Sequence, residues 1–408
     1  MKGSFPGEVF DVVVAGGGFV GVTLALALVR GGARTALIDS AAEGAGDAAP
    51  RPIALAEGSR RILDGLGVWD EIRPGATPIR VVHVSDRGHF GFTRLKARDY
   101  GVEALGYVSE AVVIGAALGR ALGSTEGVSV FRPASVHQLE FPEGRVRVGC
   151  DGAEAPRSVE TRLLAAADGG NSLVRRLSGI GARERDWRQS AITATVKTRL
   201  DPGNVAFERF TASGPLALLP MGQRRSGLVW TLPHERADAL MSEDDGPFLA
   251  TLGETFGTRL GAFTQTGPRT LHRLRSAHSR ASVKRRLALV GSAANHLHPV
   301  AGQGLNLGLR DAAILAEIVV DAVREGDDPG AITTLRRYAD WRRRDQWATA
   351  RFTEGLVRLF SNDSLPLALI RDTGLVGLDS FGFFKRGLAR HAMGLAGRAT
   401  RLSRGLSI

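Results

Sequence analysis

The chain has 408 residues, of which 43% are hydrophobic, and a formal net charge of +11. Its single cysteine, Cys150, excludes an internal disulfide bond, and no run of residues reaches the roughly 18 consecutive apolar residues of a transmembrane helix. The length is typical of two or three domains. The cysteine usage and the lack of a secretory pattern at residues 1–18 predict a cytoplasmic protein.

Residues 9–39 read as a strand, a glycine turn, a helix and a second strand. The turn "GGGFVG" places Gly16, Gly18 and Gly21 in the pattern G-x-G-x-x-G. Glycines at these positions let the backbone approach a pyrophosphate, whose charge the following helix N-terminus stabilises. Asp39 ends the second strand, where a carboxylate accepts hydrogen bonds from ribose hydroxyls. An acid there favours FAD or NAD over NADP.

The next segments alternate between strands and helices. Residues 79–95 read as two strands around a turn, 110–123 as a helix, and 190–235 as a β-rich region with Gly and Pro between its strands. Between the last two, "RLLAAADGGNS" places Asp168 directly after an apolar strand. Taken alone, an Asp-Gly-Gly sequence indicates only a turn.

A third strand, glycine-rich turn and helix follow in "LALVGSAANHLHPVAGQGLNLGLRDA", residues 287–312. Pro299 constrains the loop, and the helix that starts after it presents backbone amides to an anion or to an electron-rich ring edge. Gly302 and Gly304 flank Gln303, so we expect the backbone amides around Gln303 to face the ligand. His296 and His298 have no further ligands at metal-site spacing, so we predict packing roles for them and no metal.

The positive charge is concentrated at the C-terminus. Residues 335–408 carry 14 Lys and Arg against six Asp and Glu, and arginines are expected opposite an apolar stripe. The stripe consists of Phe381, Phe384, Leu388, Ala392, Leu395, Ala399, Leu402 and Leu406, and the arginines are Arg386, Arg390, Arg398, Arg401 and Arg404. We expect a basic amphipathic helix over 381–408 that lies on an anionic membrane or docks on a partner protein, with no nucleic-acid role. In the alternative interpretation the stripe packs back on the chain's own catalytic domain.

The three glycine motifs, in this order, resemble those of the FAD-dependent aromatic hydroxylases related to p-hydroxybenzoate hydroxylase. The segments "HVSDRG" and "FERFTASGPLALLP" narrow the likeness. They are similar to the ubiquinone-biosynthesis hydroxylases, and most of all to the 2-polyprenyl-6-methoxyphenol hydroxylases. The resemblance covers nearly the whole chain.

The resemblance implies an α/β protein in which a Rossmann-like FAD-binding domain is interrupted by a β-sheet substrate domain and followed by a helical C-terminal region. The FAD-binding domain is expected at 1–75, 103–183 and 272–330, the β-rich substrate domain at 76–102 and 184–271, and the helical region at 331–408. The expected FAD-binding residues are Gly16, Gly18, Gly21, Asp39, Arg51, Asp168, Gly291, Ser292, Pro299, Gly302, Gln303, Gly304 and Asn306. The loop containing Pro299, Gly302, Gln303 and Gly304 would lie beside the flavin ring.

Two positions depart from the family pattern. The broad family usually has an acid where this chain has Ser292, whereas the ubiquinone-biosynthesis subfamily tolerates an uncharged residue there. We expect Ser292 to make a neutral hydrogen bond to the ribityl chain. Arg51 matches a family arginine that reaches the FAD diphosphate, although its neighbours differ.

The activity implied by the resemblance is hydroxylation of a polyprenylated phenol, in which NAD(P)H reduces FAD, O₂ forms a flavin C4a-hydroperoxide, and this delivers the oxygen. Phe207, Leu219 and Pro220 are candidate substrate contacts, or else ordinary packing residues of the sheet. Two other functions stay open: an FAD-dependent isoprenoid or quinone reductase, and a non-catalytic flavin- or lipid-binding scaffold of the biosynthetic complex. The enzyme would work at the inner face of the membrane.

Overall fold

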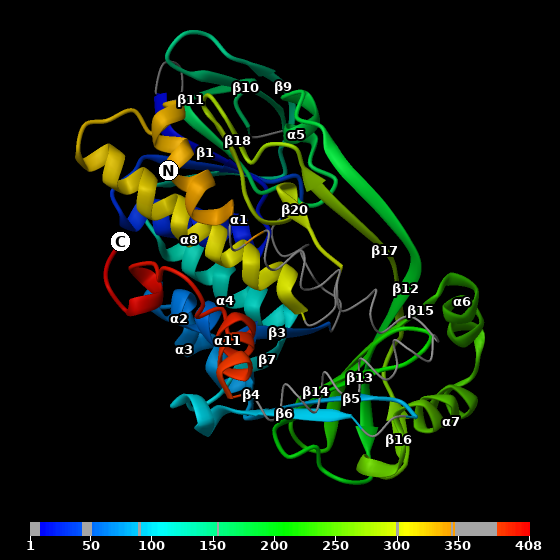
Figure 1. Ribbon diagram of the computed structural model, residues 1–408. Coiled ribbons are helices and arrows are strands. Elements are labelled where there is room, and N and C mark those ends of the chain that lie inside the picture. The colour runs from blue at the N-terminus through cyan, green and yellow to red at the C-terminus, as the bar shows by residue number, and fades with distance from the viewer. Residues whose placement is uncertain are drawn as a thin grey trace.

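The computed structural model describes residues 9–42, 51–88, 91–152, 155–298, 302–343, 346 and 382–408, without the side chains of 382–384. Its strands form three sheets, and the long strands β12 (Ala182–Thr198) and β17 (Thr270–Ser279) run side by side from the region of the first sheet into the second (Figure 1). Pro299 lies outside the described residues.

The first sheet has a parallel core in the order β19-β11-β1-β2-β8. Its strands are β1 (Val9–Ala15), β2 (Thr35–Ile38), β8 (Val128–Phe131), β11 (Ser158–Ala166) and β19 (Leu287–Leu289), with β18 (Val283–Lys284), β9 (Ser135–Glu140) and β10 (Val146–Asp151) added antiparallel. Along β1, Val12 and Val14 join one hydrophobic cluster, while Val13 and Ala15 join the other. Both faces are buried, so the strand is apolar without interruption from Val12 to Ala15.

Helices cover one face of this sheet. Most of the hydrophobic cluster that contains Val12 and Val14 comes from these helices. They are α1 (Phe19–Arg30), α4 (Ala111–Ser124) and α8 (Gln303–Arg324), together with α2 (Glu57–Gly65) and α3 (Trp69–Ile72). The short helix α5 (Leu173–Leu177) contributes to the cluster on the opposite face. α8 is nearly all buried and packs along α1 (Figure 1).

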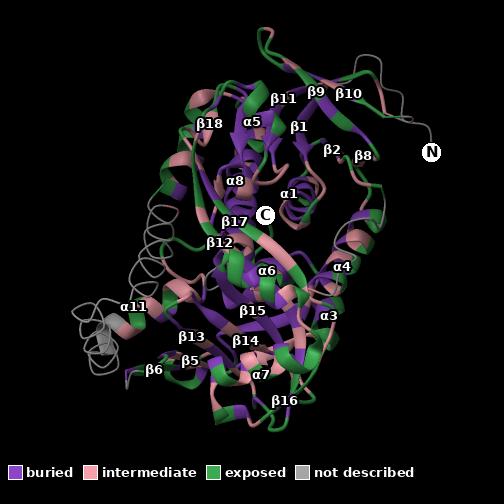
Figure 2. Cartoon of the chain, turned by 90° about the vertical axis from the view of Figure 1, so that its right-hand side faces the viewer, coloured by how far each residue is buried: buried purple, intermediate pink, exposed green. Residues whose placement is uncertain are grey.

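The second sheet has the order β20-β17-β12-β15-β14-β13-β5-β6, with β16 added to β12. Its strands are β5 (Val81–Asp86), β6 (Phe92–Lys96), β12 (Ala182–Thr198), β13 (Val205–Phe210), β14 (Leu216–Pro220), β15 (Arg225–Pro233), β16 (Phe263–Thr266), β17 (Thr270–Ser279) and β20 (Asn295–His296). α6 (His234–Ser242) and α7 (Asp245–Phe256) cover its outer face, and the strands beneath them are largely buried (Figure 2). The inner face turns toward the first sheet, which leaves room for a site between them.

A small third sheet joins the two larger ones. It has the order β3-β7-β4 and consists of β3 (Pro52–Ala56), β4 (Thr77–Ile79) and β7 (Gly106–Glu110). The predicted α/β class, with a Rossmann-like sheet and a separate β-rich sheet, is confirmed. The exact domain boundaries stay a prediction.

The predicted amphipathic helix over 381–408 is wrong beyond Ala392. α11 (Gly382–Ala392) ends before Gly394, and both Gly394 and Gly397 adopt left-handed conformations that break a helix. The chain then makes only a short turn, and its Leu402 and Ile408 side chains are buried in the core of the first sheet. Beyond α11, Leu402 and Ile408 therefore pack on the chain's own domain, as the alternative interpretation of the sequence predicts for the apolar stripe.

Polar contacts hold the same segment in place. Arg401 pairs with Asp321 of α8, with Nη1 2.6 Å from Oδ1, and its backbone amide donates to Glu317 at 2.8 Å. Arg324 donates to the carbonyl of Ile408 at 2.8 Å. Among the helices in the described ranges, none combines the length and hydropathy needed to cross a bilayer.

Candidate functional site

The three glycine motifs meet at one edge of the first sheet. Backbone hydrogen bonds join their turns: Gly16 donates to Ile38, Ala167 to Ala15, and Val290 to Ala166, each at 2.8 Å. This is the carboxyl edge of the parallel strands, where open α/β sheets bind ligands. The sequence motifs thus form one site although they lie far apart along the chain.

The glycines of the first turn serve different purposes. Gly16 has a φ of +107°, and a Cβ there would lie 2.5 Å from the carbonyl oxygen of Ala167. A Cβ on Gly21 would lie 1.9 Å from the oxygen of Gly16, so both residues are required by the packing of the turn itself. A Cβ on Gly18 would meet no atom within 4 Å. Gly18 therefore faces open space beside the turn, where a pyrophosphate can approach.

Two helix N-termini point at this edge. α1 begins after Gly18 and α8 after Gly302, which has a φ of +59°. Neither helix receives a hydrogen bond from an N-cap side chain. The first-turn amides therefore stay available to an anion or to the electron-rich edge of a ring.

Two acids lie at the same edge. Asp39 is half-buried next to the first turn, since a Cβ built on Gly17 would lie 2.3 Å from its Oδ2. Asp168 accepts the amide of Val174 through Oδ2 at 3.0 Å, while its Oδ1 is buried with no hydrogen-bond partner among the described residues. An unsatisfied buried acceptor is costly, and a ligand hydroxyl would satisfy it. This orphaned oxygen and the open face at Gly18 fit a dinucleotide cofactor such as FAD.

The Gly291–Ser292 turn is held by an acid that sequence reasoning missed. Gly291 donates its amide to Oδ2 of Asp311 at 3.0 Å, and Asp311 is fully buried against the guanidinium of Arg342. Burial raises the pKa of Asp311, and the ion pair with Arg342 opposes that rise. The signal in the sequence was an acid that directly precedes the apolar run Ala312–Ala316 of this helix. Ser292 itself is half-buried and faces the cavity described below.

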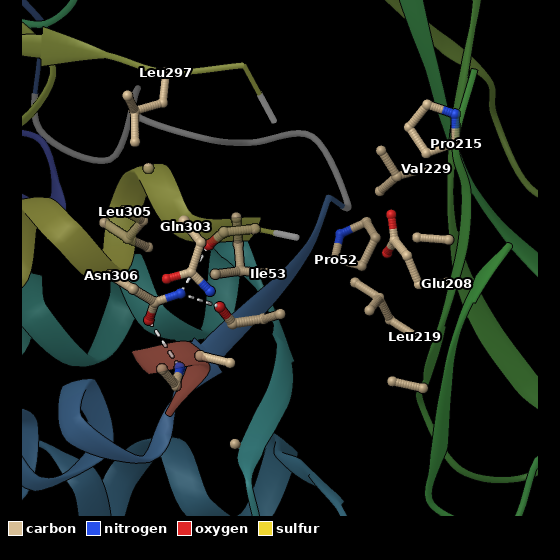
Figure 3. Close-up of a pocket in the computed structure, with 18 of the residues that line it drawn as sticks. Pro52, Ile53, Glu208, Pro215, Leu219, Val229, Leu297, Gln303, Leu305 and Asn306 are labelled. Carbon is tan, nitrogen blue, oxygen red and sulfur yellow. Dashed lines mark hydrogen bonds between the residues drawn. The ribbon is translucent and has the colours of Figure 1, made fainter. Parts of the chain in front are cut away.

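Asn306 connects the start of α8 to β3. Its Oδ1 accepts the amide of Ala56 at 2.8 Å, and its Nδ2 donates to the carbonyls of Ala54 and Gly302 at 2.9 and 2.8 Å. Figure 3 shows these bonds. The side-chain amide is thus used by the backbone, and it positions Gly302 relative to β3.

A cavity of about 930 Å³ lies between β3, the start of α8 and the inner face of the second sheet (Figure 3). The predicted residues that line it are Arg51, Phe207, Leu219, Ser292, Gly302, Gln303, Gly304 and Asn306. Leu388, Ala389, Ala392 and Met393, in and just after α11, form another part of its wall. The cavity therefore joins the glycine-motif edge to the β-rich sheet.

The three candidate substrate residues differ in position. Leu219 lines the cavity, whereas the next residue, Pro220, is not among the described lining residues, because neighbouring side chains of a strand point to opposite faces. Phe207 also borders the cavity, but its ring packs edge-to-face on Phe256 behind the sheet, with the centroids 5.5 Å apart. Sequence reasoning missed Glu208, the acid that directly follows Phe207 in β13 and faces the cavity.

The two histidines of the third motif are mostly buried. His296 lines the cavity, and burial lowers its pKa. His298 packs its ring against Trp187 with the centroids 5.3 Å apart, and burial lowers its pKa to about 4. Both rings are therefore neutral at pH 7. In the described ranges, no three His, Cys, Asp or Glu side chains gather as a metal site would require.

Comparison with known proteins identifies the family. The FAD binding domain family matches residues 9–353. Ubiquinone hydroxylase UbiL of Rhodospirillum rubrum is 39% identical, covering 98% of this chain and 94% of that protein. The 3-demethoxyubiquinol 3-hydroxylase of Escherichia coli is 32% identical, covering 94% and 98%. OxyS anhydrotetracycline hydroxylase of Streptomyces rimosus is 25% identical in its solved structure, with a TM-score of 0.74, covering 96% and 77%.

The site and the comparisons agree on the cofactor and on the type of enzyme. FAD is the cofactor, and NAD(P)H is the co-substrate typical of such flavoprotein monooxygenases. The chain therefore belongs to the FAD-dependent aromatic hydroxylase family, in the group that contains the ubiquinone-biosynthesis hydroxylases.

Proposed function

We propose that this protein hydroxylates the aromatic ring of a polyprenylated phenol in ubiquinone biosynthesis, using FAD, NAD(P)H and O₂. The observation that carries the proposal is the cavity of about 930 Å³, which runs from Ser292 and Gln303 to the apolar inner face of the second sheet. A ring held there would lie between the flavin-binding edge and a wall of Val, Ala and Leu side chains. The names of the relatives support the same substrate class.

Each part of the chain has a task in this reaction. Bound FAD supplies the redox and oxygen-activating chemistry, as cofactors do in general. The N-termini of α1 and α8 would stabilise its negative charge, and Asp39 and Asp168 would accept hydrogen bonds from its hydroxyls. Arg51 would approach the diphosphate, and Ser292 the ribityl chain. The apolar walls would exclude water from the reacting ring.

The prenyl chain needs an apolar path out of the cavity. Leu388, Ala389 and Ala392 of α11 line one side of the cavity, while Arg386 and Arg390 of the same helix are exposed. This arrangement supports a prenyl chain that lies along α11 with its end toward the surface.

The direct test is an assay of the purified protein with NAD(P)H, O₂ and a set of prenylated phenols that differ in ring substitution. We expect substrate-stimulated NAD(P)H oxidation and a product heavier by one oxygen atom, which carries the label when ¹⁸O₂ is supplied. Complementation of bacterial strains blocked at each ring-hydroxylation step would then assign the ring carbon. Absence of labelled product from every phenol would contradict the proposal.

Two other functions give different outcomes in the same assay. An isoprenoid or quinone reductase would consume NAD(P)H without incorporating oxygen. A flavin- or lipid-binding scaffold would hold FAD that NAD(P)H does not reduce, even with a phenol present. The relatives named as ubiquinone hydroxylases favour the hydroxylase.

We further propose that the enzyme meets the membrane or a biosynthetic complex through the outer face of α11, at the inner side of the membrane. The support is the pairing of exposed Arg386 and Arg390 with an apolar side that borders the cavity. Replacing both with Gln is expected to weaken binding to phosphatidylglycerol-containing vesicles about thirtyfold, at about 1 kcal/mol for each arginine. The matched control replaces exposed Arg236 and Arg280, which lie outside the C-terminal segment. Equal binding by both double variants would argue against α11 as the contact.

A further inference from the structure

Glu208 interrupts an apolar row on the inner face of the second sheet. In the sheet register it lies opposite Val84 of β5 and Ala217 of β14, and Ala217 lies opposite Val229 of β15. All four residues line the cavity. Figure 3 shows the carboxyl of Glu208 projecting from the sheet into the cavity, toward Pro52. A carboxylate thus occupies the position in the row where a fourth aliphatic side chain would be expected.

The carboxyl of Glu208 has no hydrogen bond or ion pair to any described residue. Burial raises its pKa from 4.5 to about 7, and burial is the sole cause of the shift. Glu208 is half-buried at the wall of a largely apolar cavity, and a carboxyl held there without a partner destabilises a fold unless something else uses it. The most direct user is a ligand that brings its own hydrogen-bond donor into the cavity.

The other charged or titratable groups around this cavity differ from Glu208 in charge, or their side chains contact other residues. They are Arg51, His272, Arg273, Arg275 and His296, so Glu208 is the one acid among the described lining residues. Arg273 and Arg275 direct their guanidinium groups to Asp238 and Asp186 outside the cavity. Burial lowers the pKa of His272 and of His296, and His272 lies 3.3 Å from the hydroxyl of Thr193. These imidazoles are therefore weaker bases than an unperturbed histidine.

We propose that Glu208 binds the hydroxyl of the phenolic substrate and accepts its proton, which makes it a catalytic and specificity-determining residue. This inference rests on the proposed function. In the step, the phenol O–H bond breaks, a new O–H bond forms on the carboxylate, and the electron pair stays on the phenolate oxygen. The negative charge raises electron density on the ring, which favours its attack on an electrophilic oxygen. The proton returns to the phenolate oxygen when the product forms, so the step needs no added oxidant or reductant.

The chemistry of the group suits this role. A general base works best when its pKa lies near the operating pH, and that of Glu208 does. A site built to hydrogen-bond a hydroxyl also rejects the analogue that lacks it, because the buried group is then left unpaired. The same carboxyl would therefore select a free phenol over its methyl ether.

The test compares wild-type enzyme with Glu208→Gln and Glu208→Asp, using 2-(3-methylbut-2-enyl)phenol and its methyl ether as probes. The matched control is Glu235→Gln, which alters an exposed acid on α6 outside the cavity. The measurements are FAD content, NAD(P)H oxidation without probe, probe affinity from the flavin absorbance change, and hydroxylated product as a function of pH.

We expect kcat/KM of the wild type to rise with pH through about 7, because the ionised carboxylate is the active form. Glu208→Gln should lower kcat/KM by about 10²–10⁴-fold and remove this rise. The control Glu235→Gln should keep the FAD content, the probe-free NAD(P)H oxidation and the pH profile of the wild type. Glu208→Asp should keep the pH dependence with reduced activity. The preference for the phenol over its methyl ether should fall in Glu208→Gln.

The two levels of the proposal fail differently. If Glu208→Gln keeps the wild-type pH profile and the wild-type preference for the phenol, the role of Glu208 is refuted. If the wild type makes no hydroxylated product, the proposed function fails. The affinities for the two probes then test Glu208 separately. If the wild type binds the phenol more tightly than its methyl ether and Glu208→Gln does not, the binding role is supported. If the wild type binds both probes equally, the binding role is refuted.

Discussion

At Ser292 the chain has a hydroxyl where the sequence resemblance predicts an acid in most of the broad family, and the turn around it is nevertheless ordered by a carboxylate. The amide of Gly291 is bound by Asp311 from α8, so the geometry of the turn does not depend on the side chain of Ser292. The side chain of Ser292 is left to face the cavity. Its contribution is therefore expected to be one neutral hydrogen bond to the cofactor.

Replacement of Ser292 should change FAD affinity modestly. Ser292→Ala removes one neutral hydrogen bond and should weaken FAD binding by about 1 kcal/mol, or roughly fivefold. Ser292→Asp keeps an acceptor and should retain FAD with equal or higher affinity. Equilibrium dialysis of released FAD measures both changes. Complete loss of flavin from Ser292→Asp would mean that the loop lies elsewhere relative to the cofactor.

The raised pKa of Glu208 also predicts how the free energy of unfolding depends on pH. Its pKa is raised in the folded protein, from 4.5 to about 7, so the folded state holds this proton more tightly than the unfolded chain. The wild type should therefore lose stability as the pH rises from about 4.5 to about 7. Glu208→Gln has no such loss and should be more stable at pH 8 by on the order of 1–3 kcal/mol, with little difference at pH 4.5. Urea unfolding at the two pH values measures this, and a variant that is less stable at pH 8 would contradict the burial of this carboxyl.

Among the elements, the turn between β1 and α1 shows how a motif combines packing with binding. Gly16 and Gly21 are enclosed by the chain itself, whereas Gly18 faces open space at the start of the helix. The pattern G-x-G-x-x-G was recognisable in the sequence because its strand, turn and helix are all local. The different tasks of its glycines were not, since the atoms of Ala167 that enclose Gly16 come from the turn after β11.

The two kinds of glycine can be separated by substitution. Gly21→Ala places a methyl group 1.9 Å from the carbonyl oxygen of Gly16 and should destabilise the fold by several kcal/mol. Gly18→Ala has a free Cβ direction and an ordinary φ of −69°, so its apoprotein should melt within a degree or two of wild type. Its FAD affinity should still fall, because the added methyl group occupies the approach of the pyrophosphate. Calorimetry with and without FAD makes the comparison, and unchanged FAD affinity in Gly18→Ala would remove Gly18 from the binding site.

On the scale of the whole molecule, the C-terminal segment is part of the core of the first sheet. Leu402 is 2% exposed and packs with residues of α2 and α8, whereas Leu406, four residues later, is 46% exposed. The segment before it, α11, forms a wall of the cavity. The C-terminus thus links the substrate cavity to the hydrophobic core.

This predicts unequal effects of two similar substitutions. Leu402→Ala should lower the free energy of unfolding by about 2–5 kcal/mol, as is typical of a fully buried leucine. Leu406→Ala should change it by no more than about 0.5 kcal/mol. Thermal unfolding followed by circular dichroism measures both. Similar melting temperatures for the two variants would mean that the segment does not pack on the core in solution.

The sequence by itself determined the α/β class, the Rossmann-like unit and the FAD family. These depend on short-range features: apolar strands, glycine turns and the order of Gly16, Asp168 and Gly291 along the chain. Such features are set by local backbone geometry, which neighbouring residues alone specify.

Only the tertiary structure decided which of the remaining residues meet. The apolar spacing of the C-terminal segment is equally compatible with a membrane, a partner or its own core, and the left-handed glycines together with the buried Leu402 select the core. Glu208 is unremarkable as one acid in a β-rich segment until the strand register surrounds it with Val84 and Ala217. Asp311 likewise acquires its task from the turn 20 residues before it. Burial, register and long-range contact depend on which strands and helices become neighbours, and that information is not contained in any local stretch of the chain.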